Sequence, residues 1–235
     1  LWDIKGKALN QPVYMLLGGR MRNKVVCYKG IGGRTPADSA RSARRRVDQG
    51  WQFLRLSVVD RDGILEPRTA VRDSVAHFAA VREEVGPEIE IVIDYHTRLD
   101  PPDAIKLGRE LEPYDPFFLE DPLRCENPQT YRQIRQHVSA PLAVGEHFAT
   151  KWEFRQMIEE ELLDYARIDL CIVGGLTEAR KIANWCETHY IKIVPHNPLG
   201  PVSAAACLHL DLACDNFAVQ EAGLVGDPVM EDLFP

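Results

Sequence analysis

The sequence has few of the features that mark membrane, nucleic-acid-binding or disulfide-stabilised proteins. No uninterrupted apolar run approaches the roughly 20 residues of a membrane span, and no signal peptide is visible. The net charge is −7, and the one basic run, at residues 44–46, is too short for a nucleic-acid-binding stripe. None of the six cysteines forms a C-x-x-C pair, so we expect buried, reduced thiols. These absences favour a cytoplasmic protein that binds neither nucleic acid nor a membrane.

Gly-rich linkers and low-complexity segments are also missing, which favours one continuous folded domain. Of the 235 residues, 45% are hydrophobic, enough to bury a sizeable core. We predict a helical lead-in over residues 1–23, one catalytic domain over 24–222 and a C-terminal tail over 223–235.

Eight short apolar or β-branched runs alternate with longer helical patterns, and we interpret each run as a strand. The runs lie at residues 25–30, 51–58, 89–95, 117–121, 142–146, 165–170, 191–197 and 216–222. Strands that alternate with helices indicate parallel βαβ units. Eight of them suit a closed barrel better than an open doubly wound sheet, so the predicted fold class is α/β, a TIM-type barrel.

The segments between these runs begin with helix-capping residues. Thr35 and Pro36, with Asp38 three residues after the threonine, predict an N-cap, a proline in the first turn and an acid behind it. Similar signals lie at Asp100–Pro101, at Asn127–Pro128 and at Thr150 with Glu153. A long helical pattern from Arg68 is predicted to end at Gly86.

Six successive strands are each predicted to end in an acid or a base, roughly 25 residues apart, which is about one strand–helix unit. These residues are Asp94, Glu120, Glu146, Asp169, His196 and Glu221. Acids at strand ends often only cap the next helix, but an unpaired charge directly after an apolar run is costly. Because the carboxyl ends of barrel strands meet at one rim, we expect the six side chains around one cup.

Three of these residues are carboxylates on consecutive strands: Asp94, Glu120 and Glu146. Carboxylates that meet at a rim repel one another and raise each other's pKa, and a hard divalent cation removes that conflict. Oxygen ligands favour Mg²⁺, and no His or Cys cluster with zinc spacing competes. The sequence therefore predicts a magnesium site on these three residues.

Two histidines are candidates for acid–base chemistry. His96 follows Asp94 by two residues, so strand alternation would point both into the cup. His196 is predicted to lie on an opposite strand, where Asp169 on the strand before it could orient the imidazole and raise its basicity. We interpret His77, His137, His189 and His209 as structural histidines.

Several stretches resemble the enolase superfamily, in its mandelate racemase subgroup, and within it the acid-sugar (galactonate-type) dehydratases. The resemblance spans nearly the whole chain and rests on these segments, in order: "LWDIKGKALNQPVYMLLGG", "IDYH", "FFLEDPL", "PLAVGEH", "IDLCIVGGLTEARKIA", "PHNPLGPVSAAACLHLDL" and "VQE".

The resemblance implies a modified (β/α)7β barrel with Mg²⁺ on Asp94, Glu120 and Glu146. It also implies an Asp169–His196 dyad, Glu221 near the carboxylate of the substrate, and a homo-oligomer. Members of the family carry an N-terminal capping domain and usually continue beyond the last barrel strand. We therefore expect the capping domain to be absent from this chain.

The second predicted strand distinguishes between reactions of this family. Racemases of the subgroup carry a Lys-x-Lys pair there, whereas this sequence has Arg55 and Ser57. Ser57 cannot replace a lysine base, so the sequence favours dehydration of a sugar acid to a 2-keto-3-deoxy acid. His196 would take the C2 proton, and His96 would protonate the departing 3-OH.

Three alternatives remain at this point. A racemase or epimerase of a 2-hydroxy acid would use both histidines as bases and would retain the 3-OH. A catalytically silent barrel without its lid would bind Mg²⁺ without turnover. A metal-hydrolase barrel is disfavoured because no His-x-His or bridging-lysine signature is present. Lys29, Arg34 and His147 could meet a substrate or could be solvated loop charges.

Overall fold

The computed structural model describes residues 1–60, 63–198 and 200–222. The chain forms two compact units, each considered by itself: a central unit, Tyr28–Val144, and a terminal unit made of Leu1–Cys27 and the described residues from Gly145 onward. The predicted tail at 223–235 lies outside the described residues. No helix in the described part of the chain combines the length and apolar character that a membrane span requires.

The central unit is built on a parallel sheet in which each strand pairs with the next along the chain. Its strands are β1 (Cys27–Gly30, which belongs to this unit from Tyr28 onward), β2 (Phe53–Ser57), β3 (Glu90–Asp94), β4 (Phe118–Glu120) and β5 (Leu142–Val144). In β3 every residue after Glu90 is buried, as expected for a parallel strand covered on both faces. The register places Ser57 beside Asp94, and Asp94 beside Glu120, so three strands end level at one edge of the sheet.

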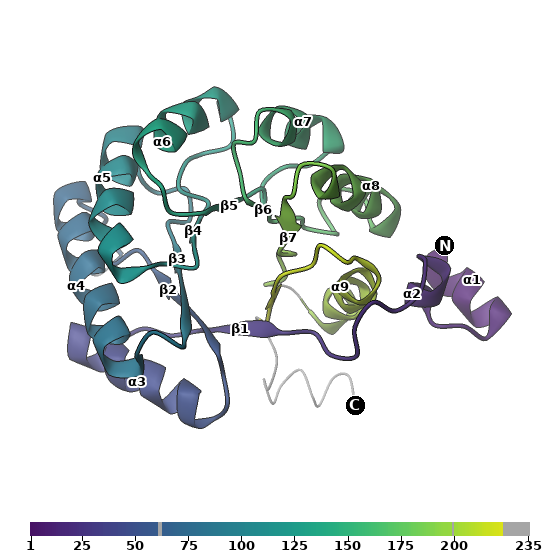
Figure 1. Cartoon of the computed structure of the whole chain (residues 1–235), viewed down its shortest axis with the longest axis horizontal. Helices are drawn as coiled ribbons and strands as arrows, with labels where there is room; N and C mark the ends of the chain where they lie inside the picture. Colours follow the sequence, from purple (N-terminus) through teal and green to yellow (C-terminus); the bar gives the residue numbers. More distant parts are fainter. Residues whose placement is uncertain (61–62, 199, 223–235) are drawn as a thin grey trace. The chain divides into compact units, whose positions relative to one another are not determined.

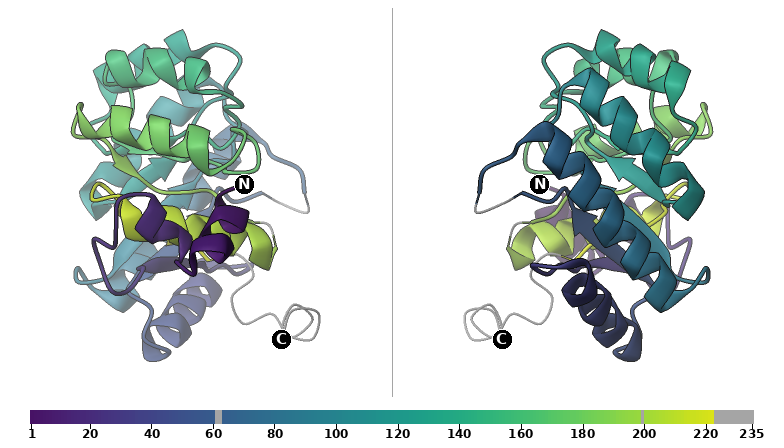
Figure 2. Two further views of the ribbon diagram at one scale, coloured as in Figure 1. Left: turned by 90° about the vertical axis from the view of Figure 1, so that its right-hand side faces the viewer. Right: turned by 90° about the vertical axis from the view of Figure 1, so that its left-hand side faces the viewer.

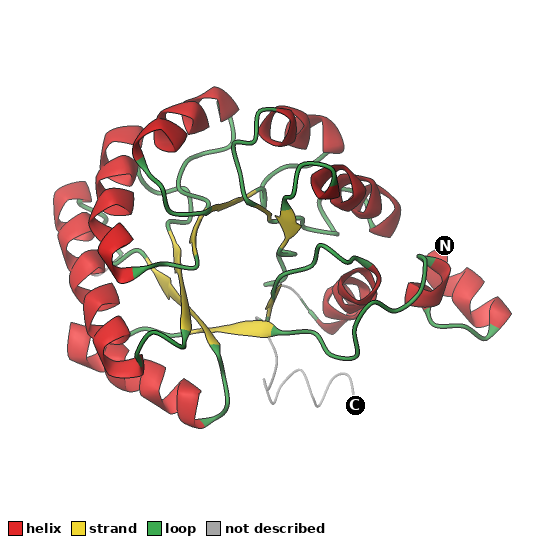
Figure 3. Cartoon of the chain, viewed as in Figure 1, coloured by secondary structure: helices red, strands yellow, loops and turns green. Residues whose placement is uncertain are grey.

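The helices of the central unit lie along one side of this sheet (Figures 1 and 3), and successive helices pack side by side (Figure 2). They are α3 (Pro36–Asp48), α4 (Pro67–Val85), α5 (Pro101–Leu111) and α6 (Tyr131–His137), with short 3-10 turns at Glu112–Tyr114 and Pro128–Thr130. The fully buried Phe78 and Val81 of α4 and Leu107 and Leu111 of α5 form the apolar faces of these helices.

The helix starts predicted at Thr35–Pro36, Asp100–Pro101 and Thr150 are confirmed. Asn127–Pro128 begins only a 3-10 turn, and α6 starts at Tyr131. Thr35 and Asp38 form a reciprocal capping box at α3, with Pro36 in the first turn. The helix from Pro67 ends at Gly86, which has a positive φ of 79°. Asp100 precedes α5, but its side chain accepts a hydrogen bond from Arg124 at 2.7 Å and makes no cap bond.

The terminal unit contains β6 (Tyr165–Ala166), β7 (Lys192–Ile193) and β8 (Gln220–Glu221), and β6 pairs in parallel with β7. Its helices are α7 (Lys151–Glu159), α8 (Leu176–Glu187), α9 (Pro201–Ala213) and the N-terminal α1 (Trp2–Leu9) and α2 (Val13–Leu16). Val13 and Leu17 pack with Ala213 of α9 in a buried apolar cluster. Trp2 Nε1–H donates to Thr177 Oγ1 at 2.9 Å, which ties the first helix to α8.

Each of the eight predicted runs contains a strand, but the strands are shorter than predicted. In the run 191–197, Pro195 has no N–H to donate to a ladder, and β7 ends at Ile193. In the run 142–146, β5 ends at Val144 because Gly145 takes a φ of 131°. Glu146 therefore lies two residues past its strand, which corrects the prediction that it ends the strand. Asp169 and His196 also lie past β6 and β7, yet they form a parallel bridge with each other.

Candidate active site

Two buried carboxylates lie side by side at the strand ends of the central unit. Asp94 is the last residue of β3 and Glu120 the last of β4, and their Cα atoms are register partners. Asp94 is 2% exposed and Glu120 is fully buried. Two adjacent carboxylates out of water require positive charge nearby, because each disfavours ionisation of the other.

Arg55 of β2 supplies that charge. Its Nη2 donates to Asp94 Oδ2 at 2.5 Å and to Glu120 Oε1 at 2.8 Å, and its Nε donates to Glu120 Oε2 at 3.1 Å. The sequence reasoning placed Arg55 only as the substitute for a lysine and missed this pairing. The signal was available, since Arg55 stands two residues before Ser57, on the same face of a strand whose end lies beside Asp94.

His96 contacts Asp94, but not by the predicted route. The strand ends at Asp94, and His96 and Thr97 take positive φ values of 49° and 56°, so strand alternation does not extend to the histidine. Instead, the His96 backbone N–H donates to Asp94 Oδ1 at 2.6 Å, and the ring Nδ1 lies 3.6 Å from Asp94 Oδ2. The imidazole is 62% exposed, so it can exchange protons with a bound molecule or with solvent.

The terminal unit holds a histidine–aspartate pair. His196 Nδ1 lies 2.7 Å from Asp169 Oδ2, while Asp169 Oδ1 accepts the backbone N–H groups of Cys171 at 2.7 Å and Ile172 at 3.0 Å. Burial alone would raise the pKa of Asp169, but these hydrogen bonds hold it below its usual value. Because an ionised carboxylate only accepts, the Nδ1 of neutral His196 carries the proton and Nε2 presents a lone pair.

A buried arginine organises the other two acids of the terminal unit. Arg167 is fully buried, and its Nη2 lies 3.1 Å from both Glu146 Oε2 and Glu221 Oε2. Burial would raise the pKa of Glu146, but Arg167 and His196 bring it below its usual value. The same two acids approach His196 Nε2, at 3.6 Å for Glu146 and 3.9 Å for Glu221.

The sequence reasoning missed Arg167, although a charged residue inside "YARIDL", two before Asp169, is a visible exception in an apolar run. Its presence bears on Glu221, which the resemblance places near the carboxylate of the substrate, because a positive charge lies directly beside this acid. Glu221 Oε2 also accepts the Asn197 backbone N–H at 3.1 Å. Glu221 therefore accepts hydrogen bonds from a guanidinium and from a backbone N–H.

The structure thus brings together the predicted residues within each unit. Asp94, Glu120 and His96 meet in the central unit; Glu146, Asp169, His196 and Glu221 meet in the terminal unit. The gathering of all of them around one cup stays a prediction. Among the residues that the structure describes, no three His, Cys, Asp or Glu side chains form a group that could hold a metal ion.

The secondary candidates occupy different surroundings. Lys29 lies within β1. The His147 ring is 45% exposed, and its Nε2 lies 3.8 Å from Glu146 Oε1.

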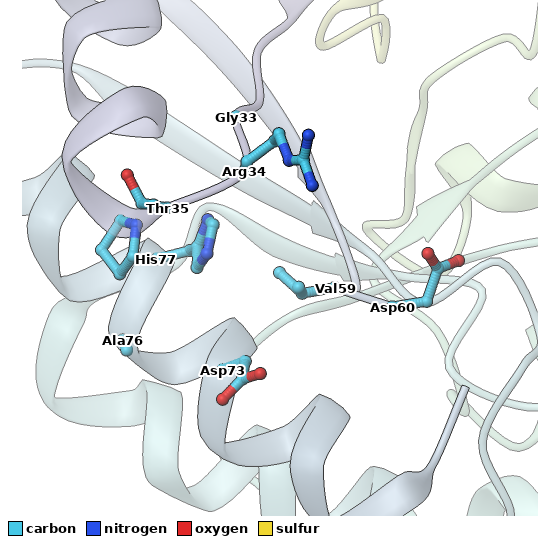
Figure 4. Close-up of a pocket in the computed structure, with 9 residues that line it drawn as sticks. Gly33, Arg34, Thr35, Val59, Asp60, Asp73, Ala76 and His77 are labelled. Atoms are coloured by element: carbon cyan, nitrogen blue, oxygen red, sulfur yellow. The ribbon is translucent and has the colours of Figure 1, made fainter. Parts of the chain in front are cut away.

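Arg34 lines a cavity of about 510 Å³ in the central unit, together with Asp60, Asp73 and His77 (Figure 4). None of the strand-end residues lines this cavity. His77 is buried, and its Nδ1 lies 2.8 Å from Ser39 Oγ, which supports its interpretation as structural.

The six cysteines are all free thiols, and Cys186, Cys207 and Cys214 are buried as expected. Burial raises the pKa of Cys27 to about 11, with a further contribution from nearby Asp211. Cys171 departs from the expectation because it is exposed.

Comparison with known proteins decides the family. Residues 38–235 match the family described as enolase C-terminal domain-like. The chain belongs to this family. An enolase from Pantoea ananatis with bound D-gluconate and Mg is 32% identical, with a TM-score of 0.91 over 98% of this chain and 64% of that one. The predicted fold class, the modified TIM barrel of the enolase superfamily, is thereby confirmed.

Curated relatives in this family carry the name D-galactonate dehydratase. The protein from Ralstonia pickettii is 38% identical over 224 residues, which are 95% of this chain and 59% of the relative. The protein from Variovorax paradoxus is 39% identical with the same coverage. This chain therefore spans 59% of the length of these relatives.

Proposed function

We propose that the chain is the barrel part of a magnesium-dependent sugar-acid dehydratase, a hydro-lyase that converts an aldonate or aldarate to a 2-keto-3-deoxy acid. Membership of the enolase superfamily and the names of its relatives support the reaction class. The observation that carries the proposal within this chain is the 2.7 Å contact between His196 Nδ1 and Asp169 Oδ2.

In this proposal His196 is the general base. The proton on C2 of a sugar acid is a weak acid, so the base must be held in one orientation with its lone pair available. Asp169 does both, because it fixes the proton of neutral His196 on Nδ1 and leaves Nε2 to accept the C2 proton. Glu146 and Glu221, within 4 Å of Nε2, then stabilise the imidazolium that forms.

His96 is the general acid. As the bond between C3 and its hydroxyl oxygen breaks, His96 gives the departing oxygen a proton, and water leaves. The resulting enol tautomerises to the 2-keto-3-deoxy acid, so the reaction needs no oxidant or further reactant. The position of the His96 ring is consistent with this role, because the ring is 62% exposed and its Nδ1 lies 3.6 Å from Asp94 Oδ2.

Asp94, Glu120 and Glu146 would hold the metal. The donor set fits a hard divalent cation, since it offers carboxylate oxygens only, and Asp94 and Glu120 are buried register partners. Magnesium, when bound, supplies the positive charge that stabilises an ene-diolate. The Pantoea ananatis relative with bound Mg supports this assignment.

Dehydration is preferred over racemisation because β2 offers no second base. Ser57 stands where the racemases carry the catalytic lysine, and a hydroxyl does not abstract a C2 proton at neutral pH. Arg55, at the other position of that pair, is held by Asp94 and Glu120. A guanidinium stays protonated in proteins and cannot act as a base.

The test is a screen of aldonic and aldaric acids with the full-length protein and Mg²⁺, reading 2-keto acid formation and deuterium exchange at C2. We expect product from at least one acid, its loss on adding EDTA, and a fall of about 10²-fold or more in His196→Asn. The matched control is His137→Asn, because the His137 ring pairs with the Gln133 carbonyl oxygen of its own helix and is not one of the strand-end residues.

Two results would contradict the proposal. Exchange at C2 with retention of the 3-OH would identify a racemase or epimerase. Mg²⁺ binding with neither exchange nor product for any acid would identify a catalytically silent barrel.

A further inference from the structure

The Arg55 guanidinium lies on the oxygens that the proposed metal would need. Three of the four carboxylate oxygens of Asp94 and Glu120 accept hydrogen bonds from Arg55, and the fourth accepts the His96 backbone N–H. The Asp94 and Glu120 side chains are 3% and 0% exposed, so water does little to offset their charges. The Arg55 side chain is 19% exposed, which leaves it an open side.

The chemistry of arginine suits this bridging position. A guanidinium presents several N–H donors in a fixed plane, so one side chain can hold two carboxylates in a defined geometry. A lysine ammonium at the same place would supply charge without that geometry. In the terminal unit, Arg167 bridges Glu146 and Glu221 in the same manner.

Building on the proposed function, we propose that Arg55 is a positioning residue that holds Asp94 and Glu120 ready for a divalent cation and competes with that cation for their oxygens. Without metal, the guanidinium offsets the repulsion between the two acids and fixes their side-chain orientation. When a dication approaches, the like charge of Arg55 opposes it, so the guanidinium must withdraw from at least some of these oxygens. The affinity of this site for a metal ion is therefore lower than the affinity that Asp94 and Glu120 would have without Arg55.

The test measures Mg²⁺ affinity by isothermal titration calorimetry and metal-free thermal stability, using the full-length protein and its Arg55→Met and Arg55→Lys variants. Arg55→Met keeps apolar bulk and removes the charge, so we expect Mg²⁺ to bind at least about tenfold more tightly. The metal-free Tm of Arg55→Met should fall, because two buried carboxylates lose their partner. Arg55→Lys, which keeps the charge, should stay within about threefold of the wild-type affinity.

Two controls separate this effect from general damage. Arg98→Met removes another partly buried arginine of the central unit, one whose guanidinium pairs with Asp60 instead of with Asp94 and Glu120. It should leave Mg²⁺ affinity unchanged. Adding Glu120→Gln to Arg55→Met should restore metal-free Tm, since it removes the uncompensated charge.

If Arg55→Met binds Mg²⁺ no more tightly than the wild type, Arg55 does not compete with the cation. If the metal-free Tm of Arg55→Met is unchanged, Arg55 does not position the two acids. Absence of Mg²⁺ binding by the wild type and every variant overturns both the competition and the metal of the proposed function. Failure to dehydrate any sugar acid, with the expected affinity and Tm changes in place, overturns the proposed function alone.

Discussion

At the scale of single residues, the most unusual group is the carboxyl of Asp211 on α9. It is fully buried, and both of its oxygens lack a hydrogen-bond partner. Burial raises its pKa well above the usual value, and Arg22 offsets this only in part. The folded protein therefore keeps a proton on Asp211 that the unfolded chain releases at its ordinary pKa of about 3.9.

This difference in proton binding predicts how stability depends on pH. Between the unfolded pKa and the raised folded pKa, the folded state binds more protons, so the free energy of unfolding falls as pH rises, by up to about 1.4 kcal/mol per pH unit. Asp211→Asn removes this titration, and its stability relative to wild type should increase from pH 5.5 to pH 7.5 in urea unfolding. The exposed control Asp48→Asn should follow the wild-type pH dependence. Parallel curves for wild type and Asp211→Asn would show that Asp211 is not protonated in the folded protein.

At the scale of elements, the end of β5 depends on a glycine. Gly145 has a φ of 131°, and a Cβ at this position would lie 2.5 Å and 2.7 Å from two ring atoms of Phe154. Phe154 is fully buried and packs edge-on against Phe148, with ring centroids 5.0 Å apart, so the ring cannot move freely. The turn at Gly145 carries the chain off the strand to Glu146.

We predict that Gly145→Ala destabilises the protein through both backbone strain and overpacking, each on the order of 1–3 kcal/mol. Gly50→Ala is the matched control, because Gly50 also has a positive φ, of 92°, but a Cβ there would meet no atom within 4 Å. Urea unfolding of both variants separates the two causes. Equal losses in the two variants would show that the contact with Phe154 does not constrain the turn.

The sequence predicted elements best where the signal is local. The apolar runs that end in Asp94 and Glu120 became β3 and β4 with those acids as last residues, and the capping box at Thr35 and Asp38 formed as predicted. The strand predicted at 191–197 is too long because it extends through Pro195, and proline lacks the N–H that a strand ladder needs.

Side-chain partnerships between strands were harder to foresee. Arg55 and Glu120 are 65 residues apart, and Arg167 and Glu221 are 54 apart. Periodicity tells which face of a strand a residue occupies, but a long side chain can reach either solvent or a neighbouring strand. Which of the two it reaches depends on the register between neighbouring strands, and that register is set by tertiary structure. The paired acids were predicted from their positions at strand ends, while the arginines that neutralise them were not.

At the scale of the whole molecule, metal binding should appear as stability. A cation that binds only the folded state raises the free energy of unfolding by about 2.7 kcal/mol at 100 times its dissociation constant. For a chain of this size that corresponds to a Tm increase of several degrees, at roughly 2–4 °C per kcal/mol. We therefore expect Mg²⁺ to raise the Tm of the full-length protein and EDTA to reverse the increase.

The net charge of −7 requires a specific control, because any cation reduces self-repulsion in an acidic protein. Sodium chloride at matched ionic strength measures this screening, and only the excess produced by Mg²⁺ reports a site. That excess should vanish in Asp94→Asn, which removes one charged oxygen donor. A Tm increase of equal size in both salts, or an unchanged Mg²⁺ response in Asp94→Asn, would place any bound metal away from the strand-end carboxylates.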